Sequence, residues 1–177
     1  MSDQPLPIFL IGLRGTGKSS VARLLAERLG WNWRDADADL EQQQGRSIRE
    51  IFAHDGETAF RDIEAAIFAD LCNLPRHVVA TGGGIILRAD NRQRLKDSGK
   101  VVWLTADAGT LWQRLQVDPD TKHRRPDLTV GGLAEIEGLL QVREPLYAEC
   151  AHFVVDTVGR CPEDVAKAIL DKLAAKP

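Results

Sequence analysis

The sequence has little of what secreted, membrane-spanning or zinc-binding proteins need. It contains three cysteines in 177 residues, and neither their number nor their spacing fits a disulfide framework or a redox pair. The four histidines also lack metal-binding spacing, so no structural zinc site is expected. The cysteines are Cys72, Cys150 and Cys161, and we interpret them as reduced, half-buried thiols of a cytoplasmic protein.

Long apolar runs and an excess of positive charge are absent as well. No apolar run approaches the length that crosses a membrane, and residues 1–5 have no basic stretch typical of a secretion signal. The net charge is −3, so composition gives no reason to expect nucleic acid or an anionic membrane as a partner. Without repeats or low-complexity linkers, residues 1–177 predict one soluble, cytoplasmic, monomeric domain.

What is present begins with a phosphate-binding pattern. Residues 12–19 read GLRGTGKS and match the P-loop pattern G-x-x-x-x-G-K-[ST] at every fixed position. Glycines there let successive backbone N–H groups turn inward on phosphate oxygens. Lys18 can reach the β- and γ-phosphates, and the Ser19 hydroxyl can bind Mg²⁺. The order of the glycines excludes the dinucleotide-binding pattern G-x-G-x-x-G.

The flanking residues supply the context that a P-loop requires. An apolar run at 7–11 precedes the glycines and is typical of a buried parallel strand. Apolar residues at helical spacing follow from Val21 to Leu29, and Gly30 is a typical helix end. Strand, glycine loop and helix together predict an ATP site.

Short apolar runs alternate with helical periodicity along the rest of the chain. They predict five strands, at 7–11, 31–34, 77–81, 100–104 and 153–155, with amphipathic helices between them. Such alternation predicts an α/β class, three-layer P-loop fold: a five-stranded parallel sheet with helices on both faces. Ser47 opens a helix through a capping box, Asp55-Gly56 breaks it, and Pro162 opens the last helix. The four tryptophans, at 31, 33, 103 and 112, are interpreted as core or half-buried packing.

A second polar set is predicted at the edge of the sheet where the P-loop lies. Asp35 and Asp37 follow the second strand, as two carboxylates on alternate sides of a strand end, and Gly82–Gly84 follow the third. One carboxylate can orient Mg²⁺ while the other faces an acceptor hydroxyl. Arg61 and Arg143 lie on helices that return toward this edge, and arginine forks pair with carboxylates. This set favours an acidic acceptor.

The residues by themselves leave alternatives open. A P-loop alone fits a hydrolase, a switch or a kinase. Asp35 and Asp37 are also ordinary charges at a helix start, and Arg61 could be a solvated partner of Glu57 or Glu64. The basic run at 122–125 could be no more than solvated charge.

The order of motifs along the chain resembles the shikimate kinase family. The motifs are the P-loop, D-x-D at 35–37, G-R-S-I at 45–48 with I-F at 51–52, G-E-x-x-F-R at 56–61 with Glu64, G-G-G at 82–84, R-P at 125–126 and R-x-P-L-Y at 143–147. They cover essentially the whole chain in order. The resemblance implies transfer of the γ-phosphoryl of ATP to the 3-hydroxyl of shikimate, giving shikimate 3-phosphate and ADP in aromatic amino acid biosynthesis. It also implies Mg²⁺ as the metal.

The resemblance implies roles for individual residues. Lys18 and Arg125 would neutralise the transferring phosphoryl group, and Asp37 would bind the attacking hydroxyl as a candidate general base. Ser19 would bind Mg²⁺ directly and Asp35 through water. Further ATP-binding candidates are Gly12, Arg14, Gly15, Thr16, Gly17, Ser20, Arg114 and Arg160, the last resembling a residue that stacks on adenine. Further shikimate-binding candidates are Arg61, Gly82, Gly83, Gly84 and Arg143 for the carboxylate, with Glu64 orienting Arg61, and Phe52, Phe60 and Pro126 as apolar walls.

Two segments complete the expected site, and several positions stay open. Residues of about 36–64 would hold shikimate, and a mobile lid loop of about 117–132 would close to bring in Arg125. The lid looks longer than in the shortest family members, so either Arg124 or Arg125 could be its arginine. Asp127 follows Pro126 where an apolar residue is often found, and Asp39 is interpreted as helix-start charge. A gluconate or nucleoside-monophosphate kinase and a nonenzymatic ATP-binding switch are the competing functions.

Overall fold

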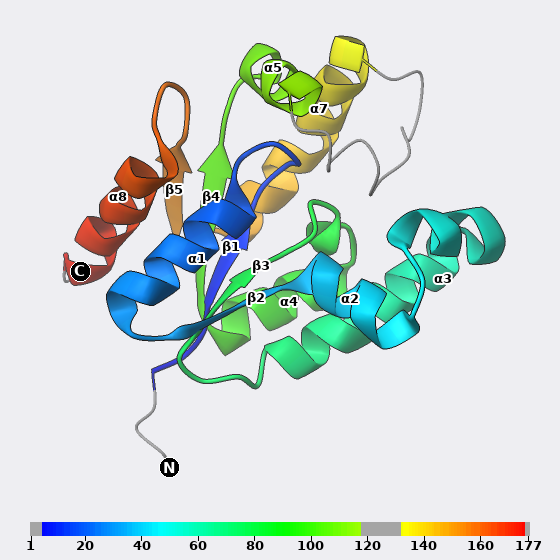
Figure 1. Cartoon of the computed structure of the whole chain (residues 1–177), viewed down its shortest axis with the longest axis horizontal. Helices are drawn as coiled ribbons and strands as arrows, with labels where there is room; N and C mark the ends of the chain where they lie inside the picture. The colour runs from blue at the N-terminus through cyan, green and yellow to red at the C-terminus, as the bar shows by residue number, and fades with distance from the viewer. Residues whose placement is uncertain (1–4, 118–131, 176–177) are drawn as a thin grey trace.

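The computed structural model describes residues 5–117 and 132–175 as a parallel sheet covered by helices (Figure 1). The five strands lie in the order β2-β3-β1-β4-β5, and every pairing is parallel. They are β1 (Ile8–Ile11), β2 (Asn32–Asp35), β3 (His77–Ala80), β4 (Lys100–Thr105) and β5 (Phe153–Asp156). The predicted sheet is confirmed. Because β1 lies at its centre, the P-loop that follows is flanked by the ends of β3 and β4.

The helices cover both faces because the central strand is apolar on both sides. Ile8 and Leu10 point to one face and pack against α1 (Lys18–Leu29) and α8 (Pro162–Ala174). Phe9 and Ile11 point to the other, where α3 (Ile48–Leu71), α4 (Ala89–Ser98) and α7 (Gly132–Cys150) lie. The remaining elements are α2 (Ala36–Gln44), η1 (Ile85–Leu87) and α5 (Ala108–Val117).

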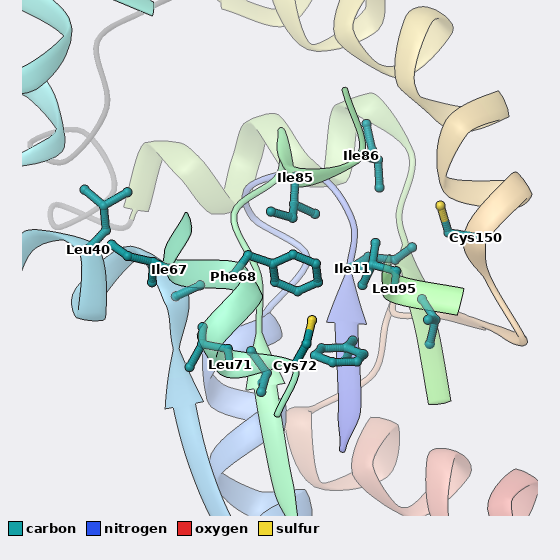
Figure 2. Close-up of a cluster of buried hydrophobic side chains, with 14 of the residues drawn as sticks. Ile11, Leu40, Ile67, Phe68, Leu71, Cys72, Ile85, Ile86, Leu95 and Cys150 are labelled. Carbon is teal, nitrogen blue, oxygen red and sulfur yellow. The ribbon is translucent and has the colours of Figure 1, made fainter. Parts of the chain in front are cut away.

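The core on the second face packs together the elements that flank the predicted acceptor site. Figure 2 shows side chains of β1, α3, η1 and α4 gathered there, among them Ile11, Phe68, Ile85 and Leu95. Each of these four is at most 1% exposed. The loop between β3 and η1 is therefore anchored at its η1 end by buried side chains.

Helix ends follow the predicted signals. Gly30 ends α1 in the left-handed conformation at φ 64°, and Pro162 opens α8. The Ser47 hydroxyl accepts from the Glu50 N–H, and the Glu50 carboxylate accepts in return from the Ser47 N–H, forming the predicted capping box. Gly56 has φ 82° and ψ 173°, which breaks the helical backbone as predicted, although the helix resumes at once and α3 spans both parts.

Sequence reasoning predicted helices between the strands but gave no bounds for one between the third and fourth, where η1 and α4 lie. The sequence of α4 is mostly polar, and only Asn91 and Leu95 of it are buried, so it has no apolar stripe to give a helical period. The helix is held instead by its contacts with η1 and α7.

Several burial predictions were wrong. Trp33 is 40% exposed, because it lies on the edge strand β2, while the other three tryptophans are half-buried as expected. Cys72 and Cys150 are buried and Cys161 is exposed, so none is half-buried, although all three are free thiols as predicted. Asp39 is only 7% exposed and pairs with Arg34 at 2.9 Å, which makes it more than helix-start charge. No helix in the described ranges is long and apolar enough to cross a bilayer.

Candidate functional site

The P-loop leaves the central strand and turns tightly into α1. A Cβ on Gly12 would lie 2.4 Å from the Leu104 carbonyl oxygen, and Gly12 has φ 141°, so only glycine fits there. The buried Thr16 hydroxyl donates to the Leu13 carbonyl oxygen at 2.9 Å and braces the turn. The Lys18 ammonium curls back over the loop and donates to the carbonyl oxygens of Gly12 and Leu13 at 2.8 and 2.9 Å. Its charge is thereby held at the mouth of the loop.

Asp35 joins the P-loop helix to the segment predicted for the acceptor. The Ser19 hydroxyl donates to Asp35 Oδ2 at 2.5 Å, while Asp35 Oδ1 accepts from the N–H groups of Asp37 and Ala38 at 3.0 and 3.2 Å. Asp35 is thus the N-cap of α2. The prediction that both aspartates alternate on a strand end was wrong, because the chain turns into α2 immediately after Asp35 and Asp37 lies in its first turn.

The Ser19 and Asp35 oxygens fit a magnesium site. Mg²⁺ prefers oxygen ligands and usually takes one or two from the protein, completing its shell with phosphate oxygens and water. A hydroxyl and a carboxylate side by side at the P-loop suit that arrangement. Within residues 5–117 and 132–175, no group of three or more His, Cys, Asp or Glu side chains is placed to hold a metal ion by itself.

A pocket of about 190 Å³ opens beside the P-loop. It brings together two arginines predicted for the nucleotide, Arg114 from α5 and Arg160 before α8, which are 46 residues apart in the sequence. Arg114 is fixed by donating to the Gly15 carbonyl oxygen at 3.2 Å and to Thr157 Oγ1 and O at 2.9 and 2.6 Å. The full lining is Gly15, Thr16, Gly17, Val21, Arg114, Thr157, Arg160, Pro162 and Val165.

Thr157 is a residue of this pocket that sequence reasoning missed. It is 2% exposed, and its hydroxyl donates to the Thr105 carbonyl oxygen at 2.9 Å while receiving Arg114. Thr157 directly follows β5, so the rule that ligands meet the carboxyl ends of parallel strands could have found it. Its role is to hold Arg114 against the P-loop.

Arg14 is anchored to α7. Its Nη2 donates to Glu135 Oε1 at 2.9 Å, and the Glu135 side chain has no exposed surface. Arg14 was predicted to bind ATP, whereas Glu135 was not singled out. Nothing in the local sequence marks Glu135, because its partner lies 121 residues away.

Arg61, predicted for the acceptor, is buried against the glycine loop. It is 7% exposed, with Nη1 donating to Glu64 Oε2 at 2.7 Å and Nη2 to Glu57 Oε1 at 3.2 Å. A Cβ on Gly84 would lie 2.3 Å from Arg61 Nη1. The guanidinium and the Gly82–Gly84 loop therefore touch, and a side chain at Gly84 would displace Arg61.

Arg143 lies on α7, the helix that contacts the same glycine loop. It is 6% exposed and lies one helical turn before Tyr147. The Tyr147 hydroxyl donates to the Gly83 carbonyl oxygen at 2.5 Å. Arg143 therefore lies on the helix that is bonded to the glycine loop, and it is buried on that helix as Arg61 is buried on α3.

The predicted apolar walls differ in exposure. The rings of Phe52 and Phe60 lie 4.5 Å apart, and Phe60 also underlies the Arg61 guanidinium at 5.0 Å. Phe60 has no exposed surface, while Phe52 is half-buried, so of the two only Phe52 presents a ring at the surface. Arg124, Arg125, Pro126 and Asp127, with all but the ends of the predicted lid, lie outside the described residues.

A P-loop on a central parallel strand, an adjoining pocket and a separate site with buried arginines define a P-loop small-molecule kinase. The family model described as "Shikimate kinase" matches residues 14–174. A shikimate kinase of Oleidesulfovibrio alaskensis is 47% identical over 150 residues, which are 84% of this chain and 87% of that protein. One of Symbiobacterium thermophilum is 42% identical over 94% of this chain and 95% of its own.

Solved structures agree. The shikimate kinase from Acinetobacter baumannii, in complex with shikimate, superposes with a TM-score of 0.90 at 36% identity and covers 97% of this chain and 96% of its own. This chain belongs to the shikimate kinase family. It is an ATP-using kinase that phosphorylates a hydroxyl of shikimate, and the competing functions, a gluconate or nucleotide kinase and a nonenzymatic switch, are set aside.

Proposed function

We propose that the residues at the carboxyl edge of the sheet divide the reaction into a donor half and an acceptor half. ATP would place its phosphates on the P-loop N–H groups and its adenine in the pocket between Arg114 and Arg160. The pocket supports this because it adjoins Gly15 and Gly17 and is walled by apolar side chains and arginines. Ser20, exposed in the first turn of α1, would border the phosphates.

Charge neutralisation would come chiefly from Lys18 and from Arg125 of the lid. Phosphoryl transfer proceeds through a loose transition state, so positioning and charge stabilisation matter more than covalent chemistry. Lys18 supports this role by the position of its ammonium over the loop. Ser19 would hold Mg²⁺ directly and Asp35 through water, and the metal when bound would neutralise charge on the phosphate oxygens.

Asp37 would receive the attacking 3-hydroxyl of shikimate. Its backbone is tied to Asp35, which in turn contacts Ser19, so the acceptor carboxylate and the metal site share one hydrogen-bonded chain. Such a connection fixes the acceptor oxygen relative to the phosphates. A proton acceptor placed in this way meets the modest demand that a loose transition state makes on a base.

Arg61, Arg143 and the Gly82–Gly84 loop would bind the shikimate carboxylate. Arg61 and Arg143 are both buried, and burial of an arginine is costly unless an anion accompanies it. Glu57 and Glu64 bind the Arg61 guanidinium and fix its orientation. A guanidinium held in this way can pair with a further planar anion such as a carboxylate. Phe52 and Pro126 would face the ring, and Phe60 would support Phe52 and Arg61 from beneath.

The buried Arg61 guanidinium packed against Gly84, in a loop that α7 also contacts through Tyr147, is the observation that carries this assignment. Arg143→Lys should raise the KM for shikimate and leave the KM for ATP unchanged, because an ammonium cannot reproduce the guanidinium fork. Arg88→Lys is a matched control, since Arg88 is a partly exposed arginine paired with Asp62. An unchanged KM for shikimate in Arg143→Lys, measured by coupled ADP release, would contradict the assignment.

Lys18→Ala tests the donor half independently. It should lower kcat severely, because the transition state loses a charge that is held over the loop. Near-normal turnover would count against the role of Lys18.

We also propose that the enzyme is a cytoplasmic monomer. Three free thiols suit a reducing compartment. Light scattering of the purified protein at assay concentrations tests the monomer, and fractionation of the cells that express it tests the compartment.

A further inference from the structure

The three carbonyl groups of the Gly82–Gly84 loop are all held, but not in the same way. The N–H of Ile85 donates to the Gly82 oxygen at 3.2 Å, and the N–H of Leu87 donates to the Gly84 oxygen at 3.0 Å. Both are local bonds of the η1 turn. The Gly83 oxygen instead accepts from the Tyr147 hydroxyl at 2.5 Å, a contact from α7 across 64 positions of sequence.

Tyr147 holds its hydroxyl at a fixed place. Its side chain is fully buried, and its ring stacks on Trp103 of β4 with centroids 5.7 Å apart and an interplanar angle of 30°. Such packing restricts the ring to one rotamer. The bond to Gly83 is therefore a fixed attachment between α7 and the loop.

The orientation of one carbonyl also sets that of the next N–H. The peptide bond between Gly83 and Gly84 is trans and planar, so the Gly83 C=O and the Gly84 N–H point in opposite directions. With the oxygen held by Tyr147, the Gly84 N–H points away from that side chain. Within the described ranges, no group accepts a hydrogen bond from the N–H of Gly83 or Gly84, which leaves both as donors for a ligand.

A loop of glycines needs such an attachment. Without side chains on either side, the Gly83–Gly84 peptide meets little steric resistance to turning over. Gly83 is buried, and its carbonyl would be costly to leave without a partner. Gly84 also touches the Arg61 guanidinium, so a turned peptide would present an oxygen where the carboxylate-binding groups gather.

We propose that Tyr147 is a positioning residue of the acceptor site. Its hydroxyl fixes the Gly83–Gly84 peptide so that the Gly84 N–H is presented to the carboxylate of shikimate. The inference rests on the carboxylate site proposed above for Arg61, Arg143 and the glycine loop. It adds a residue that touches neither substrate and acts through one peptide bond.

Tyr147→Phe is the direct test, because it removes one oxygen atom and keeps the ring. The KM for shikimate should rise about tenfold or more, the loss expected for a hydrogen bond to a charged group. The KM for ATP and kcat should stay near the wild-type values, since the lost interaction is equal in ground and transition states. Trp103→Phe keeps both the Tyr147 hydroxyl and an aromatic partner for its ring, and should leave the KM for shikimate near wild type.

A second acceptor separates positioning from general loosening. With the same ring triol lacking its carboxylate, wild type and Tyr147→Phe should have equal kcat/KM. Equal impairment with both acceptors, or a matching rise in the KM for ATP, would overturn the proposal. A normal KM for shikimate in Tyr147→Phe, together with a raised KM in Arg143→Lys, would overturn the role of Tyr147 and leave the carboxylate site standing. A normal KM in both variants would overturn the carboxylate site too.

Amide NMR of the wild-type enzyme gives a test that does not depend on how a variant folds. The Gly84 amide proton should move downfield on adding shikimate but not on adding the triol that lacks the carboxylate. An unmoved Gly84 resonance in saturating shikimate would overturn the proposal.

Discussion

Glu64 offers a sharp test of how the acceptor site is built, because Arg61 has two acidic partners of unlike burial. Glu64 Oε2 lies 2.7 Å from Arg61 Nη1, and its side chain is 5% exposed. Glu57 Oε1 lies 3.2 Å from Nη2, and its side chain is 58% exposed. Both are glutamates of α3, one turn to either side of Arg61. Glu64→Ala and Glu57→Ala are thus a matched pair of changes.

The two changes should differ severalfold in cost. Removing one partner of a buried ion pair costs about 3–5 kcal/mol, and Glu64→Ala would leave the buried Arg61 with its longer contact to the exposed Glu57. Losing an exposed pair costs about 1 kcal/mol or less. In a protein of this size 1 kcal/mol shifts the melting temperature by about 2–4 °C. We therefore expect a fall of about 6–20 °C for Glu64→Ala and of about 4 °C or less for Glu57→Ala.

Two assays read the two consequences. Urea unfolding followed by circular dichroism, together with thermal melts, gives the difference in stability. Initial rates with shikimate varied at saturating ATP give the functional effect, and Glu64→Ala should raise the KM for shikimate because Arg61 loses the partner that orients it. The KM for ATP should be unchanged.

Equal melting temperatures for the two variants would refute the reasoning, since they would show that burial does not distinguish the pairs. A large loss of stability in Glu64→Ala with an unchanged KM for shikimate would refute the functional part alone. In that case Arg61 would be a structural side chain held by Glu64, with no part in binding.

Three further predictions follow from burial and charge. Burial raises the pKa of Cys72 and of Cys150 to about 11, so a thiol reagent at neutral pH should label only the exposed Cys161. Bound ATP should slow the labelling of Cys161. Rapid labelling of all three cysteines would contradict the structure. Burial, with a neighbouring lysine, lowers the pKa of His152, so the stability of the wild-type protein should fall as pH drops below about 6.5. The fall should be smaller in His152→Gln. Equal pH dependence of the melting temperature in the two proteins would count against this. Arg114→Met should raise the KM for ATP and not that for shikimate, and the opposite pattern would move Arg114 out of the donor half.

The backbone of the site was readable from the sequence because its signals are local. The P-loop pattern, the capping box at Ser47 and the stop at Gly30 each depend on residues within one or two turns of one another. The convergence of Asp35 and Gly82–Gly84 followed from a general property of parallel sheets. These features needed no knowledge of distant contacts.

The parts that sequence reasoning missed depend on partners far along the chain. Helix α4 has almost no apolar stripe, and contacts with η1 and α7 hold it. Asp39 looked like helix-start charge until the fold buried it against Arg34. Thr157 reaches its role only when α5 brings Arg114 across it. In each case the decisive contact is tertiary, so local propensity and periodicity carry no trace of it.

Helix α7 shows how such contacts build a two-substrate site. Near its start, Glu135 holds Arg14 of the P-loop, and three turns later Tyr147 holds Gly83 of the acceptor loop. Twelve residues of helix span about 18 Å. One helix therefore contacts both loops and ties the donor half to the acceptor half. The two loops also meet directly, since a Cβ on Gly83 would lie 3.3 Å from the Gly12 carbonyl oxygen. Phosphoryl transfer needs a fixed distance between donor and acceptor oxygens, and these contacts supply the scaffold for it.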